Sequence, residues 1–192
     1  MKRWEVLNWI AKKKKYRKYL EIGNRDPKRN LDKIVCKDKT GVDPYPRGTC
    51  DYKMTSDDFF EQNKRHYDLI FIDGLHTGEQ VAIDICNALK ILSDDGTIVL
   101  HDCNPPTEWH QREKNDEGPW NGTTWKGYMH YRNCLTLKMC VVDEDWGLGV
   151  IRWGEQEPPA VEVFDYEGLE KNRVQWLNLM SYEQFKKWFK GE

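Results

Sequence analysis

The sequence predicts an α/β fold: a doubly wound, Rossmann-like, mostly parallel sheet in three α/β/α layers, with a C-terminal antiparallel hairpin. Two apolar runs, 67–74 and 97–102, have the continuous hydrophobicity of strands that are covered on both faces. Between them, apolar residues recur at helical spacing over 79–92, and the polar turn 94–96 is expected to end that helix. A strand, a helix and a strand in this order predict a parallel pair with a right-handed crossover.

The N-terminal third supplies further elements of the same kind. Residues 1–16 predict a short amphipathic helix with a basic end, and 18–23 and 40–44 predict strands that stop at a glycine and at Asp-Pro. A weaker strand is expected at 52–56, where Ser56 is placed to cap a following helix. Two or three successive units of this kind imply a doubly wound sheet.

The polar segment 104–124 breaks this pattern. It is rich in proline and glycine, and such a long loop in a compact domain is usually a lid or a binding segment. We therefore expect a lid or acceptor-binding loop here. Aromatic residues in and directly after this loop either form a pocket for an acceptor or only anchor the loop: Trp109, His110, Trp120 and Trp125.

The C-terminal part completes the sheet. Residues 125–133 predict a short helix, and 137–145 and 147–154 predict the terminal hairpin. Residues 155–192 are expected to form a helical extension, in which the helix 181–190 packs its aromatic side chains against the body. All of these elements belong to one predicted domain, residues 1–192.

Composition excludes several classes of protein. A chain of 192 residues can bury about 70% of its unfolded surface as one domain. The net charge of −2 argues against a general nucleic-acid coat, and no apolar run approaches the length of a membrane span. Six cysteines without CxxC or zinc-type spacing, and no predicted signal peptide, favour a reduced, cytoplasmic location.

Polar residues gather where the predicted strands end. Ligands of open parallel sheets bind beyond the carboxyl ends of the strands. The residues at these ends are Glu21, Gly23, Asp43, Asp73, His76, His101 and Asp102. Asp73 and Asp102 are 29 residues apart, the length of one helix plus one strand, so both should emerge at the same edge from neighbouring strands.

Three of these residues have two interpretations each. Asp43 lies 20 residues after Gly23, which suits hydrogen bonds to ribose hydroxyls, but Asp-Pro also forms simple turns. His76 is either a catalytic base or the cap of the helix that begins near Thr77. His101, inside an apolar run, is expected to be buried or to support the site indirectly.

Several motifs carry a resemblance to a known family. They are YLEIG (19–23), GVDP (41–44), TSDDFF (55–60), YDLIFIDGLH (67–76), ALKILSDDGTIVLHDCNPP (88–106) and WNGTTWK (120–126). Over about residues 17–153 the chain resembles the small class I S-adenosylmethionine-dependent methyltransferases. It most resembles the branch with I-D-G-x-H and H-D motifs (methyltransferase family 24-like), similar to cation-dependent sugar and catechol O-methyltransferases.

The resemblance implies how S-adenosylmethionine would be held. The implied cofactor-binding residues are Glu21, Gly23, Asp43, Ser56, Asp57 and Asp73, with Asp43 at the ribose and Ser56 and Asp57 beside the adenine. The first loop departs from the family's Gly-x-Gly pattern, because it reads EIGNRDPKRN with a single glycine. Either Asn24 adopts the positive φ that a second glycine would supply, or the loop has another shape.

The resemblance also implies a catalytic centre. It makes His76 the base, with Asp73 beside the reacting sulfonium group, and makes Asp73 and Asp102 ligands of Mg²⁺ or Mn²⁺. The next residue, Cys103, is too soft for Mg²⁺, so Asn104 is the expected third oxygen ligand.

The expected function is O-methylation of a small-molecule acceptor such as a sugar or a glycosylated compound. Two alternatives stay open: a catalytically silent nucleotide-binding or scaffold module of the same fold, favoured by the single glycine, and an RNA methyltransferase, favoured only by the basic stretch 12–18. The sequence predicts neither the acceptor's identity nor the oligomeric state.

Overall fold

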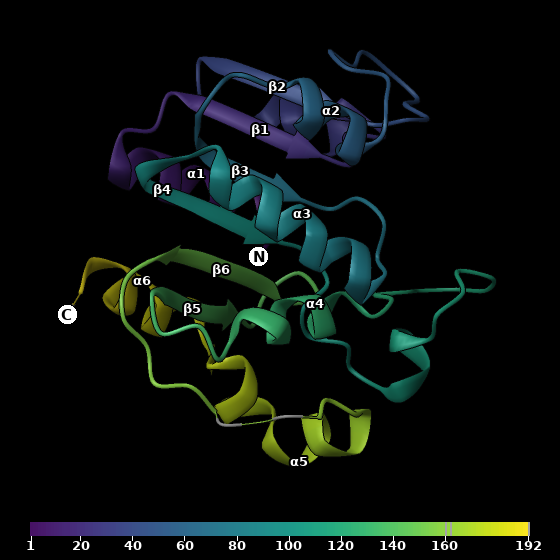
Figure 1. The fold of residues 1–192 in the computed structure, drawn as a ribbon, viewed down its shortest axis with the longest axis vertical. Coiled ribbons are helices and arrows are strands. Elements are labelled where there is room, and N and C mark those ends of the chain that lie inside the picture. The colour runs from purple at the N-terminus through teal and green to yellow at the C-terminus, as the bar shows by residue number, and fades with distance from the viewer. Residues whose placement is uncertain (160, 162, 192) are drawn as a thin grey trace.

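Among the residues that the structure describes, seven strands form one sheet in the order β2-β1-β3-β4-β6-β5-β7 (Figure 1). The structure is a computed structural model and describes residues 1–159, 161 and 163–191. The strands are β1 Lys18–Ile22, β2 Asp38–Val42, β3 Tyr67–Ile72, β4 Leu92–Leu100, β5 Leu137–Val142, β6 Leu148–Trp153 and β7 Leu179–Met180. The first four are parallel, and β6 lies antiparallel between β4 and β5. The predicted fold class, including the terminal hairpin, is confirmed.

Helices cover both faces of the sheet, because each strand is apolar on both sides. The helices are α1 Arg3–Lys14, α2 Ser56–Gln62, α3 Gly78–Lys90, α4 Thr124–Tyr131, α5 Tyr166–Leu177 and α6 Tyr182–Lys190. One hydrophobic core joins α2, α3, α4 and α5 to one face, and a second core joins α1 and α6 to the other. In the described part of the chain, every helix is too short or too polar to cross a membrane.

The boundary between α3 and β4 differs from the prediction. The helix ends at Lys90, and β4 begins at Leu92, so the polar turn 94–96 lies within a strand. The register against β3 shifts between Tyr67 and Leu69, which lets the strand absorb the extra residues as an irregularity. A bulge of this kind is indistinguishable from a helix-ending turn in the sequence alone.

The predicted strand at 52–56 was wrong. Tyr52 forms only an isolated bridge with Val42, because the chain turns immediately into α2. The helix cap is Thr55, whose hydroxyl accepts a hydrogen bond from the backbone N–H of Asp58, and Ser56 is the first helical residue. The helix therefore begins one residue earlier than expected.

The connection from β1 to β2 decides the shape of the first loop. It holds two short 3₁₀ turns, Pro27–Arg29 and Leu31–Lys33, where a doubly wound fold usually has an α-helix. Gly23 has φ of +93°, whereas Asn24 is not among the residues with positive φ. Asn24 is instead fully buried and donates to the Thr49 carbonyl at 3.3 Å, so the loop has a different shape from Gly-x-Gly.

Gly23 also allows a close approach between two strand ends. A Cβ at this position would overlap the carbonyl oxygen of Asp73, which lies directly after β3. Because Gly23 has no side chain, the end of β1 can lie this close to Asp73.

We expect Gly23→Ala to lower the free energy of unfolding by about 3 kcal/mol or more, because backbone strain and overlap add together. Gly191 is the matched control, since its φ is +82° but nothing lies within 4 Å of an added Cβ. Gly191→Ala should cost only about 1–2 kcal/mol, the strain alone. Urea unfolding measures both variants. Equal losses of unfolding free energy would show that overlap with the Asp73 carbonyl adds nothing to the cost at Gly23.

Candidate active site

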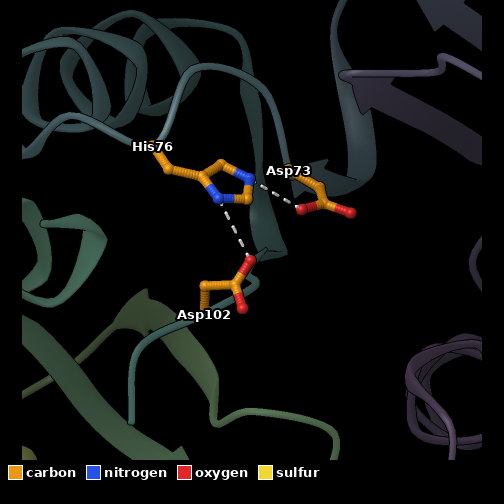
Figure 2. A group of neighbouring side chains, drawn as sticks. All are labelled: Asp73, His76 and Asp102. Carbon is orange, nitrogen blue, oxygen red and sulfur yellow. Dashed lines mark hydrogen bonds and ion pairs between the residues drawn. The ribbon is translucent and has the colours of Figure 1, made fainter. Parts of the chain in front are cut away.

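Asp73 and Asp102 meet at the carboxyl edge of the sheet, as the βαβ unit predicts. Asp73 follows β3, and Asp102 lies two residues after the end of β4. Figure 2 shows His76 between them. Its Nε2 lies 3.2 Å from Asp73 Oδ1 and its Nδ1 lies 3.3 Å from Asp102 Oδ2.

His76 is not a helix cap. The cap of α3 is Thr77, whose hydroxyl accepts from the backbone N–H of Gln80 at 3.4 Å. Burial lowers the pKa of His76, but the carboxylates of Asp73 and Asp102 outweigh it and raise the net pKa. The alternative interpretation of His76 as a cap is therefore wrong.

These three side chains have the arrangement of a possible metal site. One ligand atom from each of Asp73, His76 and Asp102 lies within 4.8 Å of the others. Two carboxylates and an imidazole suit Mn²⁺ better than Mg²⁺, which prefers oxygen alone. The donor types therefore fit a divalent cation, although the carboxylate oxygens already pair with cations of the chain itself.

Asn104, the third ligand predicted from the sequence, does not join them. Its Nδ2 donates to Asp143 Oδ1 at 2.9 Å, and its Oδ1 accepts from Arg173 at 2.5 Å. Asp143, which follows β5, and Arg173 of α5 thus hold the side chain away from the acids. Cys103 is fully buried, and burial raises the pKa of its thiol.

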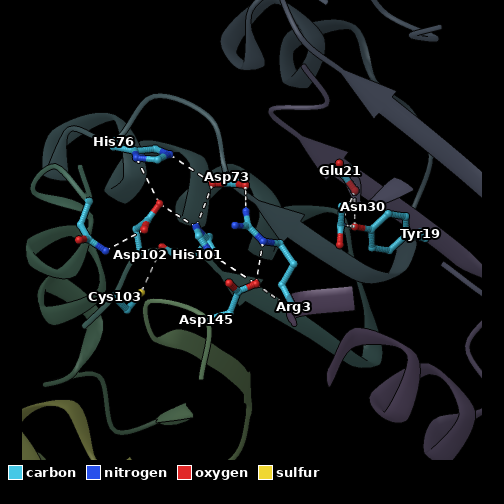
Figure 3. A network of polar contacts seen from close by, with 11 residues as sticks. Arg3, Tyr19, Glu21, Asn30, Asp73, His76, His101, Asp102, Cys103 and Asp145 are labelled. Carbon is cyan, nitrogen blue, oxygen red and sulfur yellow. Dashed lines mark hydrogen bonds and ion pairs between the residues drawn. The ribbon is translucent and has the colours of Figure 1, made fainter. Parts of the chain in front are cut away.

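His101 lies at the centre of the acid cluster rather than at its margin (Figure 3). Its Nδ1 is 2.7 Å from Asp102 Oδ2 and 3.3 Å from Asp73 Oδ1. Burial alone would lower the pKa of His101, but the two neighbouring carboxylates outweigh burial and raise the pKa to about 9. His101 is therefore a buried ring between the two acids, and these acids favour its positively charged form.

Two charged residues at the site were not predicted from the sequence. Arg3, at the start of α1, pairs with Asp73, and its Nε lies 3.1 Å from Oδ2 of Asp145 in the β5–β6 turn. Neither residue lies in a motif, because both reach the site only through packing of distant segments. Asp145 and Asp102 both have positive φ, a strained conformation that is a weak sign of a functional site. Only a structure reveals it.

The predicted acceptor loop returns to this centre. The Trp120 ring stacks on His76 with centroids 4.9 Å apart, and the buried Asn121 donates to Asp102 Oδ1 at 2.8 Å. Trp109 remains 46% exposed at the rim and contacts His110 edge to face, whereas Trp125 is fully buried in the core. Trp125 is therefore a packing residue and not part of an acceptor pocket.

The residues expected at the cofactor include Glu21, near the end of β1, and Asp43, directly after β2. Glu21 is buried and accepts hydrogen bonds from Tyr19 and Asn30, both at 2.6 Å, and burial raises its pKa to about 7. Asp43 is also buried, and its Oδ1 accepts from the backbone N–H of Tyr45 at 2.7 Å. Asp43 thus forms the turn that was its alternative role, using one of its two carboxylate oxygens.

Comparison with known proteins identifies the family. Residues 9–103 match the model of a family described as a methyltransferase domain. This part of the chain is a methyltransferase domain of that family. No curated protein matches this methyltransferase in sequence.

Solved structures share the methyltransferase fold at low identity. The S-adenosylhomocysteine-bound methyltransferase PaMTH1 of Podospora anserina is 16% identical, with 78% of this chain and 77% of that chain covered and a TM-score of 0.57. A putative caffeoyl-CoA O-methyltransferase of Staphylococcus aureus is 13% identical, with coverage of 80% and 85% and a TM-score of 0.56. The O-methyltransferase TomG of Streptomyces achromogenes, solved with S-adenosylmethionine, is 10% identical, with 78% of each chain covered and a TM-score of 0.56.

The methyltransferase has a second polar cluster between α2 and α3. Gln80 Nε2 donates to Asp57 Oδ1 at 3.0 Å and to Asp84 Oδ1 at 3.2 Å, and it lies 3.5 Å from the hydroxyl of Ser56. Asp84 is buried, and burial raises its pKa to about 6. Ser56 and Asp57, the residues expected beside adenine, therefore share the amide group of Gln80 with the buried Asp84.

Asp84 should make the methyltransferase less stable as the pH rises. Its folded pKa is raised above the unfolded value of about 3.9, so the folded state binds the proton more tightly between about pH 4 and pH 6, and stability is lost across that range. We expect Asp84→Asn to match the wild type near pH 4 and to exceed it by about 2–3 kcal/mol at pH 7.

Urea unfolding at several pH values measures this difference. A constant difference for Asp84→Asn would contradict the predicted shift.

Proposed function

We propose that this methyltransferase transfers a methyl group from S-adenosylmethionine to a hydroxyl oxygen of a small molecule such as a sugar. One observation carries the proposal: His76 is held between Asp73 and Asp102 at the sheet edge where ligands of this fold bind. Neighbours with the same fold include O-methyltransferases solved with S-adenosylmethionine or S-adenosylhomocysteine, which supports the choice of cofactor.

Residues at the ends of β1 and β2 and at the start of α2 would hold the cofactor. Gly23 lets the backbone come close to it, the buried Glu21 shapes the wall behind, and Asp43 would bind ribose hydroxyls through its remaining oxygen. Ser56 and Asp57 would border the adenine. S-adenosylmethionine supplies a methyl group already bound to a positively charged sulfur, so the chain has mainly to place the acceptor in line with it.

His76 would receive the acceptor's proton. Transfer breaks the sulfur–methyl bond, forms an oxygen–methyl bond and requires the hydroxyl proton to leave. A hydroxyl is a poor nucleophile near neutral pH, so a positioned imidazole typically contributes about 10²–10⁴ in rate. Asp73 and Asp102 hold this ring from both sides, and Trp120 stacks on its face.

A divalent cation at the same place would be held by Asp73, His76 and Asp102. It would supply Lewis acidity that lowers the pKa of the acceptor hydroxyl. An imidazole that ligates a metal cannot accept this proton through the same nitrogen. The base role and the ligand role of His76 therefore compete.

A catalytically silent nucleotide-binding module is the second candidate. It is favoured by the β1–β2 connection, which has a single glycine and two 3₁₀ turns in place of a helix. Calorimetry with S-adenosylmethionine and S-adenosylhomocysteine separates the candidates at the first step. Failure of both to bind below millimolar concentration would overturn the proposed enzyme.

For the cofactor, we expect Asp43→Ala to weaken S-adenosylmethionine binding by about 1.5–3 kcal/mol, the range for losing a hydrogen bond to a charged group. Asp94, which is exposed on β4, provides the control, and Asp94→Ala should leave affinity unchanged. Titration calorimetry measures both. An unchanged dissociation constant in folded Asp43→Ala would remove Asp43 from the cofactor site.

For the base, we expect His76→Ala to lower kcat by about 10²–10⁴ with cofactor affinity nearly intact. His76→Asn should be equally impaired, because Thr77 already caps α3 and the amide cannot take a proton. His130→Ala, on the exposed side of α4, is the control and should keep wild-type turnover. Wild-type turnover of His76→Asn with a verified acceptor would show that the proton leaves by another route.

A further inference from the structure

Arg3 joins the start of the chain to the acid cluster. Its guanidinium pairs with Oδ2 of Asp73, and its Nε lies 3.1 Å from Oδ2 of Asp145. Its backbone N–H donates to the same oxygen of Asp145 at 2.8 Å. Figure 3 shows the side chain reaching from α1 across to both carboxylates. Arg3 is therefore fixed at three points, two of them on Asp145.

The β5–β6 turn is shaped to present Asp145. Asp145 and the following Trp146 have φ of +43° and +71°, a left-handed conformation that costs free energy in residues other than glycine. The turn is tied to the end of β4 by hydrogen bonds from Cys103 N–H to Gly147 O and from Asn104 N–H to Trp146 O, at 3.0 and 2.9 Å. The Asp145 side chain is only 8% exposed. A strained and anchored turn thus holds a buried carboxylate against Arg3.

Both oxygens of Asp73 already face nitrogen atoms of the chain in this arrangement. Its Oδ2 pairs with Arg3, while its Oδ1 lies 3.2 Å from His76 Nε2 and 3.3 Å from His101 Nδ1. A guanidinium keeps its positive charge throughout the pH range of proteins. A divalent cation bound to Asp73 would therefore meet a fixed like charge at the same carboxylate.

We propose that Arg3 excludes divalent cations: Asp73 pairs either with Arg3 or with a metal ion, and the first turn of α1 must withdraw before a metal is bound. This goes beyond the proposed methyl transfer, because it concerns metal binding and holds whether or not the chain is an active enzyme. It also leaves His76 free of a metal while Arg3 is in place.

Mn²⁺ binding to the full chain tests the exclusion directly, and electron paramagnetic resonance of free Mn²⁺ measures it without any acceptor or cofactor. Arg3→Met removes the charge but keeps an unbranched side chain. We expect it to bind Mn²⁺ about 10- to 1000-fold more tightly than the wild type, the range by which one neighbouring opposite charge changes a carboxylate's affinity for a proton.

Two further variants control for charge and position. Lys14→Met removes a lysine of the same helix that pairs with Asp95 at 2.7 Å, away from the cluster, and should bind Mn²⁺ like the wild type. Arg3→Lys keeps the charge and should also resemble the wild type. Affinity of Arg3→Met within about twofold of the wild type, or Arg3→Lys binding as tightly as Arg3→Met, would overturn the proposal.

Thermal unfolding separates exclusion from simple tethering of α1. If Arg3 and metal exclude each other, Arg3→Met should unfold at a lower temperature than the wild type, and Mn²⁺ should restore much of the difference while shifting the wild type little. A lower unfolding temperature that Mn²⁺ raises no more than in the wild type would overturn the proposal. If Arg3→Met does not fold, Arg3→Gln is carried through the same measurements with the same criteria.

Discussion

The structure depends on the buried ring of His101, which lies between two carboxylates. Parallel pairing of β3 and β4 brings the carboxylates of Asp73 and Asp102 close together. Neighbouring like charges repel each other strongly when they are shielded from water. His101, the residue before Asp102, places its Nδ1 between the two acids and offsets that repulsion. Because the ring is almost fully buried, it stays there only while the sheet register holds. Strand pairing and the charge balance of the site therefore stabilise each other.

The loop between β4 and α4 adds a second constraint on the same point. Asn121 binds the outer oxygen of Asp102, and Trp120 covers His76, so the loop closes over the acids from the side of α4. In the proposed reaction, an acceptor that enters here would contact or displace Trp120. The order of this loop and the geometry of the candidate site are thus coupled through two neighbouring residues.

The sequence predicts the parts of the site that strand periodicity determines. Asp73, His76 and Asp102 follow directly from a βαβ unit, since the carboxyl ends of neighbouring parallel strands share an edge. Asn104 points elsewhere, because hydrogen bonds to Asp143 and from Arg173 fix its direction, and neither residue is near it in sequence. Arg3 and Asp145 could not be found, because their meeting depends on how α1 packs and on a left-handed turn with no glycine at its first two strained positions. The start of β4 was missed for a related reason, since a strand irregularity and a helix-ending turn use the same residues.

The position of β6 has a consequence for biosynthesis. Because β6 lies between β4 and β5, the chain emerging from a ribosome completes β4, with both acids, before the strand that covers its open side exists. Until residue 153 is available, β4 presents unpaired backbone groups and its buried side chains to other molecules. This edge is closed by β6, which directly follows the turn that carries Asp145. The newly made protein therefore gains its protection from self-association in the same late step in which Asp145, the third carboxylate, joins Asp73 and Asp102.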